Sequence, residues 1–143
     1  MSGPLSGMRV IEGSAFVAAP SGGMALAQLG AEVIRFDPIG GGLDYKRWPL
    51  TEDGFSLYWA GLNKGKKSIQ VDLRSGEGQE ILQALITAPG EDAGYFLTNF
   101  PAKGWLSFDN LCQRREDLIM LNVLGNHDGT TALDYTVNAA MGY

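Results

Sequence analysis

The sequence predicts an α/β fold in which helices flank a parallel sheet. Short apolar segments of strand length alternate with longer segments of helical periodicity along the 143 residues, as expected for parallel strands joined by crossover helices. Residues 8–38 contain a complete β-α-β unit, which returns the chain to begin a second parallel strand. Residues 118–124 are apolar on both faces, as in a strand inside a parallel sheet. The length suits one domain with a substantial core.

The β-α-β unit comes first in the chain. Residues 8–12 and 33–36 predict buried strands, and residues 24–29 predict a small-residue helix that ends at Gly30. The loop at 14–23 follows the first strand and leads into this helix, where backbone N–H groups and the helix dipole favour an anion. Its small residues suit either a ligand close to the backbone or tight packing of helix on sheet. The fingerprint G-x-G-x-x-G is absent, which argues against NAD and FAD.

A long glycine-rich loop follows at residues 39–54 and carries Tyr45 and Trp48. Loops of this length are usually functional or disordered, and the aromatic residues argue against disorder. We expect the two aromatic side chains to pack beneath the loop, and a place in a ligand cleft is the alternative. Residues 55–62 then predict a short aromatic helix.

Lys64, Lys66 and Lys67 precede the next predicted strand at residues 68–73. Such a group is expected in a solvated turn, and contact with a polyphosphate is the alternative, because ammonium groups act as point charges for phosphate. Ser75 predicts the N-cap of the following helix. That helix is expected to bury one face, formed by Ile81, Leu82, Leu85 and Ile86.

The last third of the chain continues the alternation. Residues 95–97 predict a short strand that ends in the polar pair Thr98-Asn99, and polar residues at the carboxyl end of a strand are well placed for ligands. Residues 108–115 predict a helix, and residues 133–143 predict another after the strand at 118–124. Because no further strand or helix follows to complete the sheet, we expect the chain to be the first part of a longer protein.

Composition and charge argue against several classes of function. A net charge of −5 without a long basic run argues against general nucleic-acid binding. No stretch approaches the roughly 18 uncharged apolar residues of a membrane span, and the N-terminus lacks the pattern of a signal peptide. The single cysteine, Cys112, cannot form an internal disulfide, which fits a reducing cytoplasm.

The sequence offers few catalytic side chains of its own. A pair of Cys112 and His127 is formally possible, but Cys112 lies in a predicted helix and His127 in a predicted turn. No spacing of histidine, cysteine and carboxylates predicts a zinc site. Several aspartates are candidates for acid–base or nucleophilic roles but are more simply explained as turn formers, caps or surface charges: Asp37, Asp44, Asp72, Asp128 and Asp134. The residues alone are consistent with an α/β domain for a phosphorylated ligand.

Four stretches carry a family resemblance: RVIEGSAFVAAPSGGMALAQLGAEVIRFDP, LNKGKKSIQVDL, FLTNFPAKG and LDYTVNAAMG. In order and spacing they resemble the class III CoA-transferases, which include formyl-CoA transferase and α-methylacyl-CoA racemase. The most specific signature is N-K-x-K-x-S-I-x-x-D-L, and the similarity covers nearly the whole chain. GGGLDYKRWP and NVLGNHDGTTALDYTVNAAMGY most resemble members that move CoA between the two carboxyl groups of mesaconyl-CoA, a C5 dicarboxylate thioester.

The resemblance implies a Rossmann-like parallel sheet that is incomplete relative to the family. Residues 1–143 would form the N-terminal part of the large CoA-binding domain, without the second domain and the returning C-terminal part. CoA would enter as part of an acyl-CoA substrate, with no permanently bound cofactor. Intact members of the family are interlocked homodimers, and we expect neither nucleic acid nor membrane as a partner of this chain.

The resemblance also implies a set of CoA-contacting positions: Val17, Ala18, Val71, Asp72, Leu73, Arg74, Asn99, Phe100, Pro101, Lys103, Thr131 and Asp134. Arg74 is expected to pair with a phosphate. The chain departs from the family's pattern in three places. Val17 stands where a glutamine is frequent, Pro38 stands where some members have an arginine, and Lys103 also stands in place of an arginine.

Catalysis in the family uses an aspartate that attacks the acyl-CoA carbonyl to form an anhydride, after which CoA thiolate returns to give an aspartyl thioester. The resemblance places this aspartate beyond Tyr143, so Asp134 is not assigned the role, and the chain alone is expected to be inactive. Two alternatives to an enzyme fragment are a weak CoA-binding module and a non-catalytic interaction protein. If the chain is part of an enzyme, two other reactions are alternatives to CoA transfer within mesaconyl-CoA: CoA transfer from an acyl-CoA to a separate carboxylate, and acyl-CoA racemisation.

Overall fold

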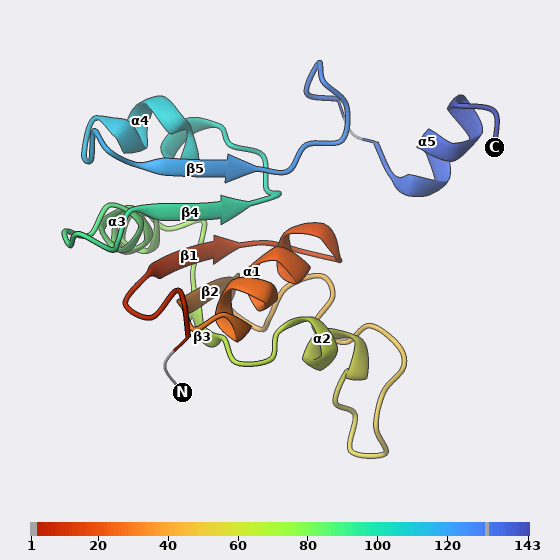
Figure 1. Ribbon diagram of the computed structural model, residues 1–143. Helices are drawn as coiled ribbons and strands as arrows, with labels where there is room; N and C mark the ends of the chain where they lie inside the picture. Colours follow the sequence, from red (N-terminus) through yellow and green to blue (C-terminus); the bar gives the residue numbers. More distant parts are fainter. Residues whose placement is uncertain (1–2, 131) are drawn as a thin grey trace.

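The computed structural model describes residues 3–130 and 132–143, and its strands form one parallel sheet (Figure 1). The strand order is β3-β2-β1-β4-β5. The strands are β1 (Arg9–Gly13), β2 (Glu32–Pro38), β3 (Lys67–Val71), β4 (Tyr95–Thr98) and β5 (Ile119–Asn122). All neighbouring pairs are parallel, which confirms the predicted fold class. Because the chain builds outward from β1 in one direction and then in the other, the topological switch point lies between β1 and β4.

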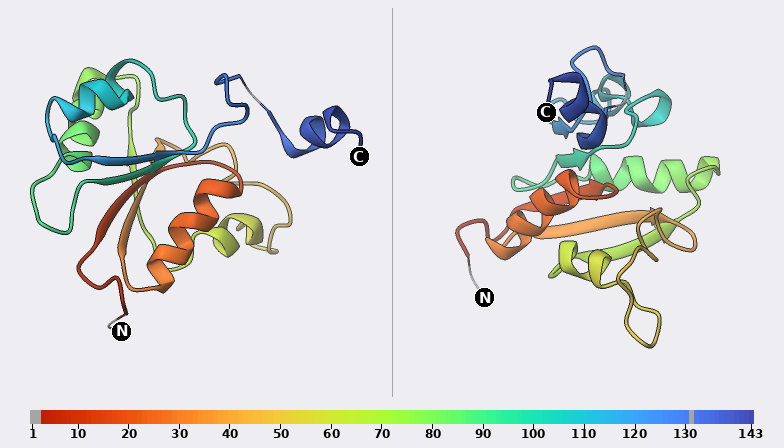
Figure 2. Two further views of the ribbon diagram at one scale, coloured as in Figure 1. Left: turned by 45° about the horizontal axis from the view of Figure 1, so that its top comes forward. Right: turned by 90° about the vertical axis from the view of Figure 1, so that its right-hand side faces the viewer.

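Helices cover the two faces of the sheet unequally. The helices are α1 (Ala18–Gln28), α2 (Leu57–Leu62), α3 (Gly76–Ile86), α4 (Phe108–Cys112) and α5 (Asp134–Ala140), with a 3-10 turn at Gly104–Leu106. α1 lies on one face, whereas α3 and α4 lie on the other (Figure 2). α5 stands clear of the sheet, beyond the carboxyl ends of the strands (Figure 1). Among the described residues, no helix has the length and apolarity that crossing a membrane requires.

The alternation of side chains along the strands produces two hydrophobic clusters. Ile11, Phe36 and Phe96 face α3, where they meet Leu82 and Ile86. Their neighbours along the strands face α1 and form the second cluster with Ala19 and Ala31: Val10, Val33 and Leu97. The central strands β1 and β2 are therefore covered on both faces, as a parallel sheet requires.

The first helix is longer than predicted, because it begins at Ala18 rather than at residue 24. Pro20 lies in its first turn, where the missing N–H would have no intrahelical partner in any case. A Cβ at Gly23 would lie 1.7 Å from Glu12 Oε2. Ala19 is fully buried against the sheet. The small residues after Ala18 therefore serve tight packing of helix on sheet, one of the two explanations that the sequence left open.

The third helix begins where Ser75 predicts, since the Ser75 hydroxyl accepts a hydrogen bond from Gly78 N–H at 2.9 Å. Its predicted buried face is wrong in one member, because Ile81 is 50% exposed while Leu82 and Ile86 are 0% exposed. Gly78 orients the helix, since a Cβ there would lie 2.1 Å from the Asp72 carbonyl oxygen. The helix therefore meets the sheet through the stripe that includes Gly78, Leu82 and Ile86.

The last strand contradicts the prediction that residues 118–124 are buried on both faces. Ile119 is 60% exposed and Leu121 is 61% exposed. On this face α1 covers the strands around β1, and no helix in the described parts of the chain lies over β5 (Figure 2). The result is an open apolar groove of about 320 Å³, lined by Met8, Val10, Gly22, Leu26, Tyr95, Phe96, Leu97, Ile119 and Leu121.

The packing of α3 gives a test of the fold with a control one residue away. Leu82→Ala is expected to lower the free energy of unfolding by about 3 kcal/mol, because it leaves a cavity beneath a fully buried side chain. Ile81→Ala changes the same helix at an exposed position and is expected to have a small effect. Urea unfolding followed by circular dichroism measures both; equal losses would contradict this orientation of α3.

Candidate functional site

The carboxyl ends of β1 and β4 are joined by side chains at the switch point. Asn99 Oδ1 accepts a hydrogen bond from Ala15 N–H at 2.9 Å, and Asn99 Nδ2 donates to the Ala15 carbonyl at 2.8 Å. Thr98 Oγ1 donates to the Gly13 carbonyl at 2.7 Å. The polar residues at the end of β4 therefore anchor the loop after β1, in the crevice where open parallel sheets bind ligands.

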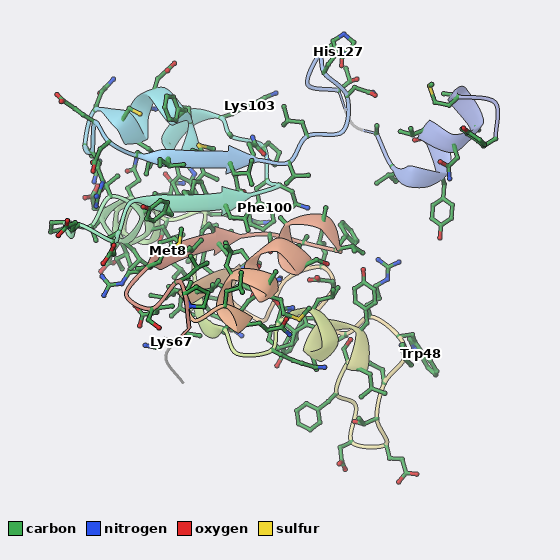
Figure 3. The ribbon with its side chains drawn as sticks, in the orientation of Figure 1. Met8, Trp48, Lys67, Phe100, Lys103 and His127 are labelled. Atoms are coloured by element: carbon green, nitrogen blue, oxygen red, sulfur yellow. The ribbon has the colours of Figure 1, made fainter. Side chains whose placement is uncertain are left out.

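A cavity of about 230 Å³ opens at this end of the sheet. Its lining comes from the ends of four strands and the loop after β2: Ser14, Ala15, Pro38, Gly42, Leu43, Leu73 and Phe100. Phe100 packs edge-on against Phe36 with ring centroids 6.1 Å apart, and Figure 3 shows it at the carboxyl end of β4. Two of the predicted CoA positions, Leu73 and Phe100, thus meet in one cavity although they follow β3 and β4, strands that are not neighbours.

A buried ionic cluster lies behind the cavity, centred on Arg35 of β2. Its guanidinium holds both oxygens of Asp37 at 2.9 Å, and Nη2 also lies 3.3 Å from Asp44 Oδ1. Nη1 donates to Asn63 Oδ1 at 3.1 Å and to Ser14 Oγ at 3.3 Å. The Arg35 side chain is fully buried. These hydrogen bonds satisfy the whole fork of donors that the arginine presents.

Glu12 of β1 extends the cluster on the side of α1. Its Oε1 accepts hydrogen bonds from Lys66 Nζ at 2.8 Å and from Ser14 Oγ at 2.5 Å. Lys66 Nζ also donates to the carbonyl of Pro20, at 2.8 Å. Burial raises the pKa of Glu12, and burial lowers the pKa of Lys66, in both cases against the attraction between the two groups. The cluster joins β1 and β2 to α1 and to the turn before β3.

One residue of the first loop adopts a strained backbone. Phe16 has φ = 66°, in the left-handed region that non-glycine residues rarely enter. Its N–H donates to Asp44 Oδ2 at 3.1 Å, and Asp44 is held in turn by Arg35. The ionic cluster therefore fixes the conformation of the loop that precedes α1.

The predicted CoA positions on the first loop and β3 are accessible. Val17 and Ala18 are exposed, and the N-terminus of α1 has no side-chain cap. Arg74 is exposed as well, in a turn closed by Asp72 Oδ1, which accepts from Arg74 N–H at 3.0 Å. Val71 is half-buried and ends β3 beside Pro38. These residues surround the carboxyl end of the sheet without lining the cavity.

The later predicted positions are more scattered. Pro101 and Lys103 are exposed after β4, and Figure 3 shows Lys103 above β5, close to α4. Asp134 begins α5, which lies apart from the other predicted positions (Figure 1). Thr131 lies outside the described residues.

The lysine group and the aromatic loop differ partly from their predictions. The Lys66 side chain is only 2% exposed and contacts Glu12, so this lysine is not part of a solvated turn. Lys67 pairs with Glu32 at the surface. Tyr45 packs edge-on against Trp59, as expected for a residue beneath the loop. Trp48 does not pack beneath the loop, because it is 78% exposed and points into solvent (Figure 3).

Cys112 and His127 do not form a pair. Cys112 ends α4 and packs against the hydrophobic cluster beneath it. His127 is exposed in the turn after β5, near the opposite end of that strand (Figure 3). Among the described residues, no group of histidine, cysteine and carboxylate side chains could hold a metal ion.

Sequence reasoning missed the ionic cluster. It interpreted Asp37 and Asp44 as turn formers or surface charges and assigned no role to Glu12 or Arg35. A signal was present, because Glu12 and Arg35 interrupt apolar strands that the fold buries on both faces. A charge at such a position needs a partner.

Residues 5–143 match the family described as CoA-transferase family III. The chain belongs to this family. It is 68% identical over 143 residues to 2-methylfumaryl-CoA isomerase from Chloroflexus aurantiacus. It is 39% identical over 127 residues to succinyl-CoA–D-citramalate CoA-transferase from the same organism.

The chain spans about a third of the length of these relatives. The alignments cover 99% of the chain and 35% of the isomerase, and 85% of the chain and 31% of the citramalate transferase. A crystal structure of a CaiB/BaiF family protein from Brucella suis superposes with a TM-score of 0.85 and 26% identity. That match covers 99% of this chain and 40% of the other, which agrees with an α/β fold that is incomplete relative to the family.

Removing the central guanidinium tests the ionic cluster. Arg35→Met is expected to lower the free energy of unfolding by about 3–5 kcal/mol, because it leaves buried carboxylates without their cation. Arg114→Met is the matched control, since Arg114 pairs with Glu80 at the surface, and it is expected to change little. Urea unfolding compares the two variants; similar small losses would contradict the role assigned to Arg35.

The raised pKa of Glu12 predicts a pH dependence of stability. The folded state holds the Glu12 proton more tightly than the unfolded state, in which the pKa of Glu12 is near 4.5. Protonated Glu12 therefore contributes to the free energy of unfolding below pH 4.5, and this contribution is lost as the pH rises through the raised pKa. Glu12→Gln cannot ionise, so its stability relative to the wild type should increase with pH across that window. Urea unfolding at a series of pH values measures the difference, with the exposed substitution Glu52→Gln as control.

Proposed function

We propose that this chain forms the N-terminal part of the CoA-binding domain of an enzyme that moves CoA between the C1 and C4 carboxyl groups of mesaconyl-CoA. The observation that carries the proposal is the 68% identity to 2-methylfumaryl-CoA isomerase over 99% of the chain. The relatives named for transfer of CoA between separate molecules are less similar, as the 39% identity of the citramalate transferase illustrates. This difference favours transfer within one molecule.

The carboxyl end of the sheet supports CoA as the ligand. The uncapped N-terminus of α1, at the exposed residues Val17 and Ala18, offers backbone N–H groups to phosphate. Arg74, across the sheet at the end of β3, is exposed and available for a charge-assisted bond to another phosphate. The cavity between Leu73 and Phe100 is apolar enough to receive the pantetheine chain of the cofactor.

The reaction requires a carboxylate nucleophile, which the family supplies as an aspartate. No residue of this chain takes that role. The chain binds and orients the thioester. The complete enzyme would be a homodimer of the cytoplasm, as the single cysteine and the family's interlocked assembly suggest.

CoA binding tests the proposal directly. Isothermal titration of the 143-residue chain with CoA should give a millimolar or tighter dissociation constant, and the same preparation should show no CoA transfer on mesaconyl-CoA. Arg74→Gln should weaken CoA binding by about tenfold, or about 1.4 kcal/mol, because it removes a charge-assisted hydrogen bond to phosphate.

Arg9→Gln is the control, since Arg9 begins β1 at the opposite end of the sheet, where it pairs with Glu32. It should leave CoA affinity unchanged. Absence of CoA binding at millimolar concentration would refute the proposed binding role. CoA transfer by the isolated chain would refute the proposal that this chain lacks the nucleophile.

A further inference from the structure

Arg47 is held between two aromatic rings. Its guanidinium carbon lies 5.6 Å from the centre of the Phe16 ring and 4.6 Å from the centre of the Tyr58 ring. Phe16 belongs to the loop after β1 and Tyr58 to α2, so two separate elements fix one cation. Aromatic faces attract the flat surfaces of a guanidinium and leave its N–H groups directed outward in the plane.

The surroundings of Arg47 differ from those of most other arginines in the chain. Four of them contact carboxylates: Arg9, Arg35, Arg114 and Arg115. In the described parts of the chain, no carboxylate lies within salt-bridge distance of the Arg47 guanidinium. Arg47 is thus positioned by aromatic rings rather than neutralised by an acid.

Backbone strain places one of these rings. Phe16 has φ = 66°, and a non-glycine residue in that region costs about 1 kcal/mol or more. The buried carboxylate of Asp44 accepts the Phe16 N–H and holds the strained conformation. Asp44 lies only three residues before Arg47 in the sequence, so one short segment both fixes the ring and supplies the cation that stacks on it.

The pair comes from the two loops that help to line the cavity at the carboxyl end of the sheet. Ala15, which directly precedes Phe16, lines the cavity. Gly42 and Leu43 line it as well, from the same loop that carries Arg47. The loops after β1 and β2 therefore supply both part of the cavity lining and the two residues of this pair.

We propose that Arg47 binds the free carboxylate of the acyl group when a dicarboxylic acid monothioester of CoA occupies the site. This inference rests on the proposed function and adds the residue that distinguishes a dicarboxylyl thioester from a monocarboxylyl one. The outward N–H groups of a guanidinium match the two oxygens of a carboxylate. The aromatic rings hold the guanidinium in place before the ligand arrives, which limits the entropy lost on binding.

The test compares two thioesters of equal chain length, succinyl-CoA with a free carboxylate and butyryl-CoA without one. Isothermal titration of the 143-residue chain should show that Arg47→Gln weakens succinyl-CoA binding about tenfold and changes butyryl-CoA binding less than about twofold. Lys46→Gln removes the same charge from the neighbouring exposed residue and should leave the ratio of the two affinities unchanged.

Arg47→Lys keeps the charge and the aliphatic stem, so it serves as a second variant if circular dichroism shows that Arg47→Gln does not fold. It loses the paired N–H geometry and should weaken succinyl-CoA binding several-fold, with butyryl-CoA again unaffected. Equal effects on both thioesters, or none on either, would overturn the role of Arg47 and leave the CoA site intact. A wild-type chain that binds neither thioester would overturn the proposed function together with this inference.

Discussion

The guanidinium of Arg35 is the group on which the carboxyl end of the sheet depends. It is fully buried, and its hydrogen bonds reach the residue after β1, β2 itself, the loop after β2 and the residue after α2. Removing a charge from water is costly unless partners surround it, so Arg35 and the carboxylates of Asp37 and Asp44 require one another. This mutual dependence fixes the relative positions of the segments that carry these residues.

The ionic cluster fixes the conformation of the first loop, residues 14–17. Asp44 holds Phe16 from one side, and Asn99 holds Ala15 from the other. Between them the chain turns into α1 with Val17 and Ala18 exposed. Gly23 then brings the helix close to Glu12, so the small residues of this region divide into those that pack and those that stay accessible. Tight packing therefore explains the buried small residues, and a ligand close to the backbone stays a prediction for the exposed ones.

Local sequence patterns predicted the elements that local interactions determine. The Ser75 cap and the order of helices and strands follow from neighbours in the sequence, and so did the carboxyl-end placement of Asn99 and Phe100. Burial depends on distant neighbours, which is why Ile81 and the outer face of β5 were wrongly expected to be buried. The ionic cluster required pairing across strands, and only the presence of charges within apolar strands indicated it.

The two lateral edges of the sheet differ in a way that bears on handling the protein. At one edge, β3 presents Lys67, Ser68 and Gln70, polar residues that discourage another chain from adding a strand. At the other edge, β5 exposes Ile119 and Leu121 beside backbone groups that have no further strand in the described residues. Self-association at high concentration would begin there. Polar substitutions at the exposed positions of β5 are therefore the changes expected to improve solubility, and they leave the ionic cluster intact.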